Sequence, residues 1–197
     1  IHVPFCQKRC IYCDFYSTTY ALEWKRSYVA ALKREMLMRH AEIDSSRVPS
    51  LYIGGGTPSQ LPSALLLEVF RSITETFTFA DDAEITIEVN PDDVTTDLIA
   101  ALRQTSVNRI SMGVQTFSDE LLRFLNRRHT SAQALRAVQL FREAGYNNIS
   151  LDLIYGLPGQ TFEDWTHDVR QLLKLDVPHL SAYALSYEEG TPLYKML

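Results

Sequence analysis

The sequence predicts an α/β domain in which six parallel strands alternate with helices. Strand-like segments begin near residues 1, 50, 84, 107, 148 and 179, and apolar residues at helical spacing follow each of them. Parallel strands need long crossover connections, which are usually helices. The segments also alternate polar with apolar residues, whereas parallel strands that are covered on both faces are nearly continuously apolar. We therefore expect one sheet with an apolar face under helices and a polar face opposite.

The polar face has two possible explanations. The sheet can curve into a partial barrel whose interior holds a polar ligand, or it can be open with one face in solvent. The polar positions of the second to fifth strands are Ser50, Tyr52, Glu84, Thr86, Glu88, Arg109, Ser111, Gln115, Ser150 and Asp152. The pattern alone leaves both explanations open.

The first elements are predicted from periodicity and from turn residues. A strand that starts at the first residue leads into a cysteine-rich loop, and residues 21–41 have the charge and apolar pattern of an amphipathic helix. A strand at 50–53 runs into a glycine-rich turn. The next helix, at 63–76, has Pro62 near its first turn, where a missing amide hydrogen is tolerated.

The central elements continue the alternation. The strand at 84–89 is followed by a helix at 96–104, for which Thr95 is the expected N-cap residue. A strand at 107–114 and a short helix at 118–125 come next.

The last elements repeat the strand and helix pattern. A helix at 131–144 is expected to end at Gly145, because glycine readily adopts the left-handed conformation that follows a helix. A strand at 148–154, a helix at 162–173 and a strand at 179–185 complete the prediction.

All three cysteines lie close together in the first loop, at Cys6, Cys10 and Cys13. Thiolates at this spacing can converge on one object, and they are soft ligands suited to zinc or an iron–sulfur cluster. A structural zinc site needs a fourth ligand, which His2 could supply. An odd number of clustered cysteines argues against a disulfide framework. A four-iron cluster held by three cysteines leaves one iron free to bind a cofactor.

Residues 2–17, His-Val-Pro-Phe-Cys-Gln-Lys-Arg-Cys-Ile-Tyr-Cys-Asp-Phe-Tyr-Ser, resemble the radical S-adenosylmethionine superfamily. Within it they are similar to the group of oxygen-independent coproporphyrinogen III oxidases and HemW-type heme chaperones. The resemblance implies a [4Fe–4S] cluster on Cys6, Cys10 and Cys13, with S-adenosylmethionine bound through the remaining iron. It also implies a six-stranded parallel partial (β/α)6 barrel, like part of a TIM barrel, with cluster and cofactor at its mouth. This expectation favours the partial barrel over the open sheet.

Length and composition set broad limits. The 197 residues fit one domain, and we expect residues 1–197 to be a single partial barrel that is truncated at both ends and lacks a C-terminal accessory domain. A net charge of −5 and the lack of a basic cluster argue against nucleic acid as a partner. No apolar run is long enough to span a bilayer. Because a cluster and unpaired thiols need reducing surroundings, we expect a cytoplasmic protein.

The turn after the second strand is a candidate cofactor site. Gly55, Gly56 and Thr57 belong to a Gly-Gly-Gly-Thr-Pro sequence, and glycine lets the backbone approach a ligand closely. The turn lacks the lysine of a phosphate-binding P-loop. An ordinary tight turn is the alternative, and the resemblance implies a contact with the amino group of the methionine moiety.

Three further candidates follow the third and fourth strands. Glu88 could accept hydrogen bonds from a cofactor amine or ribose, or it could be a plain surface carboxylate. Gln115 offers a donor and an acceptor for the ribose. Arg127 could bind the methionine carboxylate with two hydrogen bonds, although a solvated arginine is the simpler explanation and Arg128 is a near rival. The resemblance associates these positions with cofactor binding.

Asp152 stands between Leu151 and Leu153 in a predicted central strand, where an ionised carboxylate is costly unless it is paired or faces a polar ligand. A structural salt bridge is the alternative explanation. By resemblance, Asp152 contacts the cofactor, Tyr12 lies against its adenine, and Ser186 reaches it from the end of the sixth strand.

The resemblance implies two possible functions. A coproporphyrinogen III oxidase removes carbon dioxide from porphyrinogen propionates in heme biosynthesis, whereas a HemW-type chaperone binds heme and transfers it to partner proteins. The oxidase pattern has a fourth cysteine two positions after the third, where this chain has Phe15. We therefore favour the chaperone, with a low-potential electron donor and heme-receiving proteins as partners. An unrelated substrate stays a third possibility, and no catalytic residue is assigned.

Overall fold

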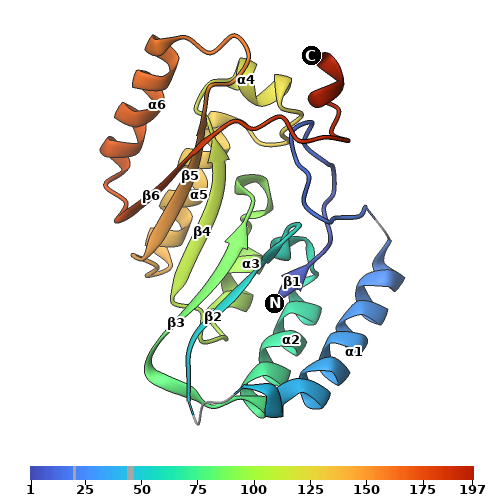
Figure 1. Cartoon of the computed structure of the whole chain (residues 1–197). Helices are drawn as coiled ribbons and strands as arrows, with labels where there is room; N and C mark the ends of the chain where they lie inside the picture. The colour runs from blue at the N-terminus through green and yellow to red at the C-terminus, as the bar shows by residue number, and fades with distance from the viewer. Residues whose placement is uncertain (20, 44–46) are drawn as a thin grey trace.

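The computed structural model describes residues 1–19, 21–43 and 47–197, and its centre is one six-stranded parallel sheet (Figure 1). The strands follow one another across the sheet in the order of the sequence. They are β1 (His2–Val3), β2 (Val48–Gly55), β3 (Phe79–Val89), β4 (Arg109–Gln115), β5 (Ile149–Tyr155) and β6 (His179–Ala184). The predicted alternation of parallel strands and helices is confirmed.

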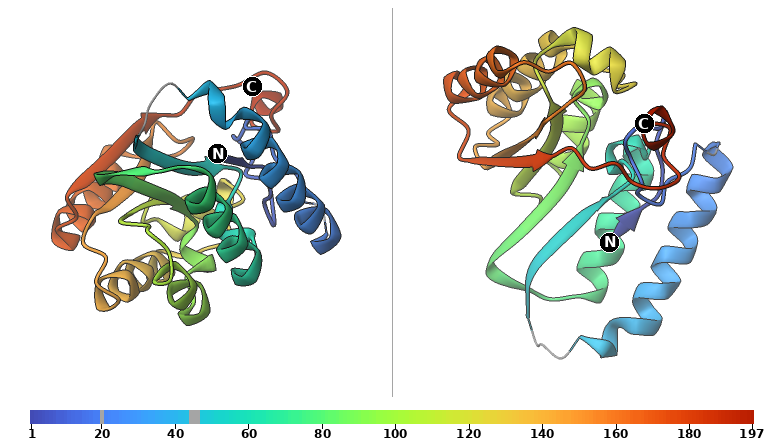
Figure 2. Two further views of the ribbon diagram at one scale, coloured as in Figure 1. Left: turned by 90° about the horizontal axis from the view of Figure 1, so that it is seen from below. Right: turned by 45° about the horizontal axis from the view of Figure 1, so that its top comes forward.

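Helices connect successive strands and form an arc around the outer face of the curved sheet (Figure 2). They are α1 (Leu22–Arg39), α2 (Ser63–Thr76), α3 (Thr96–Leu102), α4 (Asp119–Phe124), α5 (Ser131–Glu143) and α6 (Phe162–Leu175). Short 3-10 turns occur at His40–Glu42, Pro58–Gln60, Pro91–Asp93 and Tyr194–Met196. None of the helices in the described ranges is long and apolar enough to cross a membrane.

Local residue chemistry explains where several helices begin and end. The side chain of Thr95 accepts a hydrogen bond from the amide of Leu98, which confirms its predicted role as an N-cap. Thr130 and Gln133 form a reciprocal capping box at the start of α5. Gly145 follows α5 with a φ of 94°, a conformation that favours glycine.

Three predicted boundaries are wrong by two to five residues. The strand predicted at 84–89 begins at Phe79, because its start pairs with Val48 across a register shift. The strand predicted at 107–114 begins at Arg109, since the Asn108 side chain bonds the backbone of β3 in place of a ladder pair. Helix α1 ends at Arg39 rather than at residue 41. The bounds predicted for α2 are confirmed, and Pro62 is its N-cap residue.

The apolar residues of the strands point toward the helices and form the core. Ile53, Ile87, Ile110 and Leu151 come from four successive strands and are all fully buried in one cluster. Burial of such side chains removes apolar surface from water and is the main favourable term for this packing. The polar residues between them must therefore face the inner side of the sheet.

The strand register places these inner residues side by side. Glu88 lies opposite Ser111 on the next strand, and Gly113 lies opposite Asp152, which in turn lies opposite Ser181. The inner face bounds a cavity instead of a flat solvated surface. The partial barrel, and not the open sheet, is therefore the correct explanation of the polar face.

Candidate functional site

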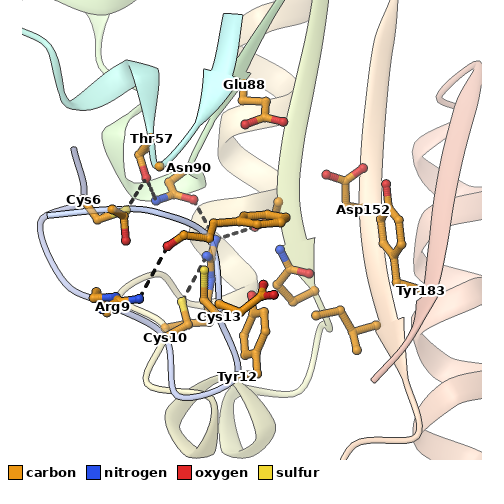
Figure 3. Close-up of a pocket in the computed structure, with 18 of the residues that line it drawn as sticks. Cys6, Arg9, Cys10, Tyr12, Cys13, Thr57, Glu88, Asn90, Asp152 and Tyr183 are labelled. Carbon is orange, nitrogen blue, oxygen red and sulfur yellow. Dashed lines mark hydrogen bonds between the residues drawn. The ribbon is translucent and has the colours of Figure 1, made fainter. Parts of the chain in front are cut away.

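A cavity of about 500 Å³ lies at the carboxyl ends of the strands, inside the curve of the sheet (Figure 3). Every residue predicted to hold a metal or cofactor lines it, namely Cys6, Cys10, Tyr12, Cys13, Gly55, Gly56, Thr57, Glu88, Gln115, Arg127, Asp152 and Ser186. These residues come from all parts of the chain. Their convergence is a structural finding, while the role of each one stays a prediction.

The cysteine loop is closed at its base by backbone hydrogen bonds and is packed against α1. The amide of Cys6 donates to the carbonyl of Thr18, whose own amide donates to Pro4, at 2.9 and 2.7 Å. Buried Phe5 packs edge to face against Tyr28 of α1, with ring centroids 5.3 Å apart. The three thiols are free and partly exposed. The fold therefore presents them on a held loop at the edge of the cavity.

The donor set fits an iron–sulfur cluster better than a single metal ion. Within the described ranges, no three His, Cys, Asp or Glu side chains gather closely enough to share one ion. The zinc alternative with His2 is not supported, because the His2 Nε2 atom is instead 2.9 Å from the carbonyl oxygen of Tyr16. A cluster of several irons needs no such gathering, since each cysteine binds its own iron.

Glycine in the turn after β2 is required by neighbouring protein atoms. A Cβ atom on Gly54 would lie 2.7 Å from the Glu88 carboxylate, and one on Gly55 would lie 2.6 Å from the His2 ring. A Cβ on Gly56 would lie 3.0 Å from the backbone of Phe5. Gly55 also has a φ of 111°, which other residues rarely adopt. The glycines thus bring the turn against β1 and Glu88, whereas close approach to a ligand stays a prediction.

Glu88 is held by hydrogen bonds to both carboxylate oxygens. The Tyr52 hydroxyl donates to Oε1 at 2.7 Å, and the amide of Gly55 donates to Oε2 at 3.0 Å. Burial and the neighbouring Glu88 carboxylate both raise the pKa of Tyr52, so this hydroxyl keeps its proton. Glu88 is therefore a positioned carboxylate in the cavity wall, not a free surface group.

Gln115 adopts an unusual backbone conformation at the end of β4. Its φ is 70°, and the pairing of β4 with β5 shifts register between Gly113 and Gln115. A Cβ atom on Gly113 would lie 2.7 Å from the Gln115 amide nitrogen. Gly113 therefore makes room for the Gln115 side chain, a requirement that the polar and apolar pattern did not reveal.

The structure separates the rival arginines. Arg128 Nη2 lies 2.5 Å from Asp92 Oδ2 and 2.7 Å from Asp93 Oδ1, so Arg128 is engaged in structural ion pairs. Arg127 points into the cavity wall, where it donates to the carbonyl of Gly113 at 2.6 Å and to the side chain of Asn90 at 2.8 Å. Its Nε atom is buried and has no hydrogen-bond partner in the described part of the chain. Binding of a carboxylate by Arg127 stays a prediction.

Asp152 lies on the inner face of β5, and burial raises its pKa to about 6. The nearby Glu88 carboxylate adds to the rise, while a hydrogen bond with Ser181 opposes it. Among the described residues Asp152 makes no ion pair. The salt-bridge alternative is therefore wrong, and the carboxylate faces the cavity.

Tyr12 and Ser186 lie where the sequence placed them, beside the cysteines and after β6. Burial raises the pKa of Tyr12, so its hydroxyl keeps its proton. Asn90, Ser111 and Tyr183 also line the cavity, although they were not predicted as site residues. Asn90 could have been found, since it directly follows the strand that carries Glu88.

His129 is a buried neighbour of the site. Its Nε2 atom is 3.0 Å from the carbonyl oxygen of Val114, and burial together with the charge of Arg127 lowers its pKa to about 3. His129 is therefore neutral at physiological pH, and its Nε2–H donates to the end of β4.

Comparison with known proteins gives a family match and likenesses that cover nearly all of this chain. The model of the family described as the Radical SAM superfamily matches residues 1–172. The chain is 37% identical to the heme chaperone HemW of Bacillus subtilis over 198 residues, which is all of this chain and 52% of that protein. It is 40% identical to the heme chaperone HemW of Lactococcus lactis over 190 residues, 96% of this chain and 49% of that protein.

Among solved structures, the chain resembles coproporphyrinogen III oxidase (HemN) from Escherichia coli, described as a radical SAM enzyme. The TM-score is 0.88 at 34% identity, and the match covers 95% of this chain and 43% of that one. The chain thus spans about half the length of the curated relatives it matches.

Proposed function

Because this chain belongs to the radical S-adenosylmethionine superfamily, we propose that it binds a [4Fe–4S] cluster and S-adenosylmethionine and acts as a heme chaperone. The single observation that carries the proposal is the convergence of three cysteines and the predicted cofactor residues on one cavity. The likeness to HemW proteins over nearly the whole chain supports heme as the cargo.

The residues that line the cavity suit both a [4Fe–4S] cluster and S-adenosylmethionine. Cys6, Cys10 and Cys13 would hold the cluster, which when bound supplies one electron for cleavage of the cofactor's carbon–sulfur bond. The carboxylates of Glu88 and Asp152 accept hydrogen bonds from amine or hydroxyl groups. Together with the glycine turn they orient a cofactor that carries both kinds of group.

The neighbouring side chains set the electrostatics of the cavity. Arg127 keeps a positive charge beside Cys10, where it offsets the negative charge of bound thiolates. Tyr12 lines the cavity beside the cysteines and shields this part of it from water. This arrangement favours charge transfer to a bound cofactor over reaction with solvent.

The proposal includes partners and a location. A low-potential electron donor would reduce the cluster, and heme-receiving proteins would take the cargo. A cytoplasmic location suits the partly exposed free thiols, which persist under reducing conditions. With about half the length of the HemW relatives present here, the cargo and its receivers belong to the proposal for the whole protein.

Coproporphyrinogen III oxidase activity is the second candidate. The structural likeness to the Escherichia coli oxidase favours it. The oxidase pattern has a fourth cysteine where this chain has Phe15, and this difference argues against oxidase activity. Phe15 lines the cavity and is 64% exposed. A phenyl side chain cannot act as a thiolate ligand or as a redox group.

The deciding experiment is an anaerobic assay of the cluster-reconstituted protein with S-adenosylmethionine, a reductant and coproporphyrinogen III, followed by heme titration and transfer to a heme-free acceptor. We expect S-adenosylmethionine and heme to bind, heme to move to the acceptor, and no decarboxylated porphyrinogen to form. Formation of the doubly decarboxylated product would refute the chaperone proposal in favour of the oxidase.

A further inference from the structure

Hydrogen bonds join two of the three cysteine sulfurs through side chains from three separate loops (Figure 3). Cys6 Sγ lies 3.5 Å from Thr57 Oγ1, to which Asn90 Nδ2 donates at 3.3 Å. Arg127 Nη2 donates to Asn90 Oδ1 at 2.8 Å, and Nη1 of the same guanidinium donates to Cys10 Sγ at 3.5 Å. Asn90 is the midpoint of this chain of contacts and touches neither sulfur itself.

The chemistry of the groups fixes the direction of these bonds. An arginine side chain can only donate, so the Asn90 oxygen must face Arg127 and its NH₂ group must face Thr57. Asn90 donates to the Thr57 oxygen, and a Cys6 thiolate that binds a cluster has no hydrogen to give, so the Thr57 hydroxyl must be the donor in its contact with Cys6. Both ends of the chain therefore deliver a donor to a cysteine sulfur.

Burial strengthens these contacts. Thr57 is only 5% exposed, and the hydrogen bonds made by Asn90 and Arg127 are partly buried. In such surroundings a hydrogen bond to a charged group is stronger than in water. The two sulfurs are thus solvated by fixed protein donors. Cys13 is arranged differently, since its thiol has a backbone hydrogen bond with Phe15.

Donors to cluster sulfurs change the energy of electron uptake. The reduced cluster carries one more negative charge than the oxidised cluster, so a donor aimed at a thiolate stabilises the reduced form more. Hydrogen bonds to the sulfurs are among the factors that set the potential of iron–sulfur clusters. The direction that Asn90 imposes therefore has a redox consequence.

We propose that Asn90 is a positioning residue that raises the reduction potential of the cluster by directing the Thr57 hydroxyl to Cys6 and holding Arg127 against Cys10. The inference rests on the proposed function, because it requires that the three cysteines bind a cluster. The alternative is that Asn90 only fastens the loops after β2 and β3 together. The measured reduction potential separates these two roles of Asn90, since a residue that only links the loops would leave the potential of an intact cluster unchanged.

The test is a redox titration of the cluster-reconstituted protein without S-adenosylmethionine, followed by electron paramagnetic resonance. In Asn90→Asp the shape is kept, but the carboxylate only accepts, so the Thr57 hydroxyl turns from Cys6 to the new oxygen. We expect the ratio of reduced to oxidised cluster at a fixed potential to fall about tenfold, which is a shift of ~59 mV for one electron. Thr57→Val removes the donor without adding charge and should shift the potential in the same direction.

Thr57→Ser is the matched control, because it keeps the hydroxyl and should titrate like the unchanged protein. Equal potentials in the unchanged protein and in Thr57→Val, with cluster content preserved, would overturn the inference, because the added charge of Asn90→Asp lowers the potential by itself. If Asn90→Asp does not fold, the Thr57 pair decides alone. A protein that takes up no cluster even without substitution would overturn the proposed function first, which keeps the two failures distinguishable.

Discussion

The cavity has two walls that differ in how firmly their polar groups are held. The cysteine wall consists of the loop with Cys6, Cys10 and Cys13, the turn of Gly55, Gly56 and Thr57, and Glu88, Asn90 and Arg127. The outer-strand wall consists of the inner residues of β5 and β6 with Asp152, Tyr183 and Ser186. The first wall is a connected network of hydrogen bonds, whereas the second is largely open.

The network on the cysteine wall leaves its side chains little freedom. Glu88 accepts two hydrogen bonds, and Arg127 donates to Asn90, Gly113 and Cys10. On the outer-strand wall, Tyr183 is 55% exposed and Asp152 has a raised pKa. β6 is one of the two edge strands of the described sheet and is mostly exposed. Preorganised groups suit a fixed cofactor, while an open wall suits a ligand that comes and goes.

Loss of one cysteine should be the strongest way to break the cysteine wall. In Cys13→Ser a thiolate ligand is replaced by a poor ligand, so we expect most bound iron and the visible charge-transfer absorbance to be lost. Iron analysis and absorbance after anaerobic reconstitution measure this. Ser186→Ala, on the other wall, should keep its iron. Full iron content in Cys13→Ser would contradict the cluster assignment.

Glu88→Gln should weaken cofactor binding without removing the cluster. An amide cannot accept from both Tyr52 and Gly55, and the loss of a hydrogen bond to a charged group typically costs about 1.5–3 kcal/mol. We expect the dissociation constant of S-adenosylmethionine to rise about tenfold or more by calorimetry. Glu84→Gln, on the same strand with a side chain 54% exposed, is the matched control and should bind normally. Normal binding by Glu88→Gln would remove the carboxylate from the site.

The outer-strand wall should respond to pH through Asp152. Its pKa is raised from 3.8 to about 6, so the carboxylate ionises as the pH rises past 6 and becomes a better acceptor. We expect affinity for S-adenosylmethionine to increase several-fold between pH 5 and pH 7. Asp152→Asn should bind more weakly at pH 7 and should lose this dependence. A pH dependence that survives in Asp152→Asn would assign it to another group.

The raised pKa of Asp152 also predicts that the stability of the fold decreases with rising pH, whereas the affinity for S-adenosylmethionine increases. The folded state binds the Asp152 proton more tightly than the unfolded state, so stability falls as the pH rises from about 4 to about 6 and stays lower above that. Asp152→Asn removes this penalty. We expect it to be more stable than the unchanged protein at pH 7.5 by on the order of 1 kcal/mol, which raises the melting temperature by about 2–4 °C. A lower melting temperature would show that the carboxylate stabilises the fold.

Tyr183→Phe should have the smallest effect. The side chain is more than half exposed on the outer-strand wall, so its hydroxyl is well solvated without a ligand. We expect less than about a threefold change in affinity for S-adenosylmethionine, since exposed contacts contribute little. A tenfold loss would show that this wall is as preorganised as the other one.

The fold could be predicted from the sequence because each rule used for it concerns residues that are close in the chain. Alternating strands and helices specified the parallel sheet, and Thr95 and Gly145 marked helix ends through their own side-chain or backbone chemistry. The polar residues at the strand ends indicated where a site could lie, because parallel strands bring these ends to one edge, while the family resemblance favoured the cavity and implied the cofactor roles. Cys6 and Asp152 therefore came together although they lie far apart in the chain.

What the sequence did not predict depends on tertiary contacts. The side chain of Asn90 is positioned by hydrogen bonds with Thr57 and Arg127, and no spacing rule connects these residues in the sequence. Gln115 enters the cavity through a register shift and a positive φ. The glycines of the turn after β2 are required by His2, Phe5 and Glu88 and not by a ligand alone.

The most direct test of the account is addition of S-adenosylmethionine to the reduced, cluster-reconstituted protein, observed by electron paramagnetic resonance. If the cluster and the cofactor share the one cavity, the spectrum of the reduced cluster should change on addition, and Glu88→Gln should need about tenfold more cofactor for the same change. A cluster spectrum that stays the same at saturating cofactor would contradict the account, because it would place the cofactor away from the three cysteines.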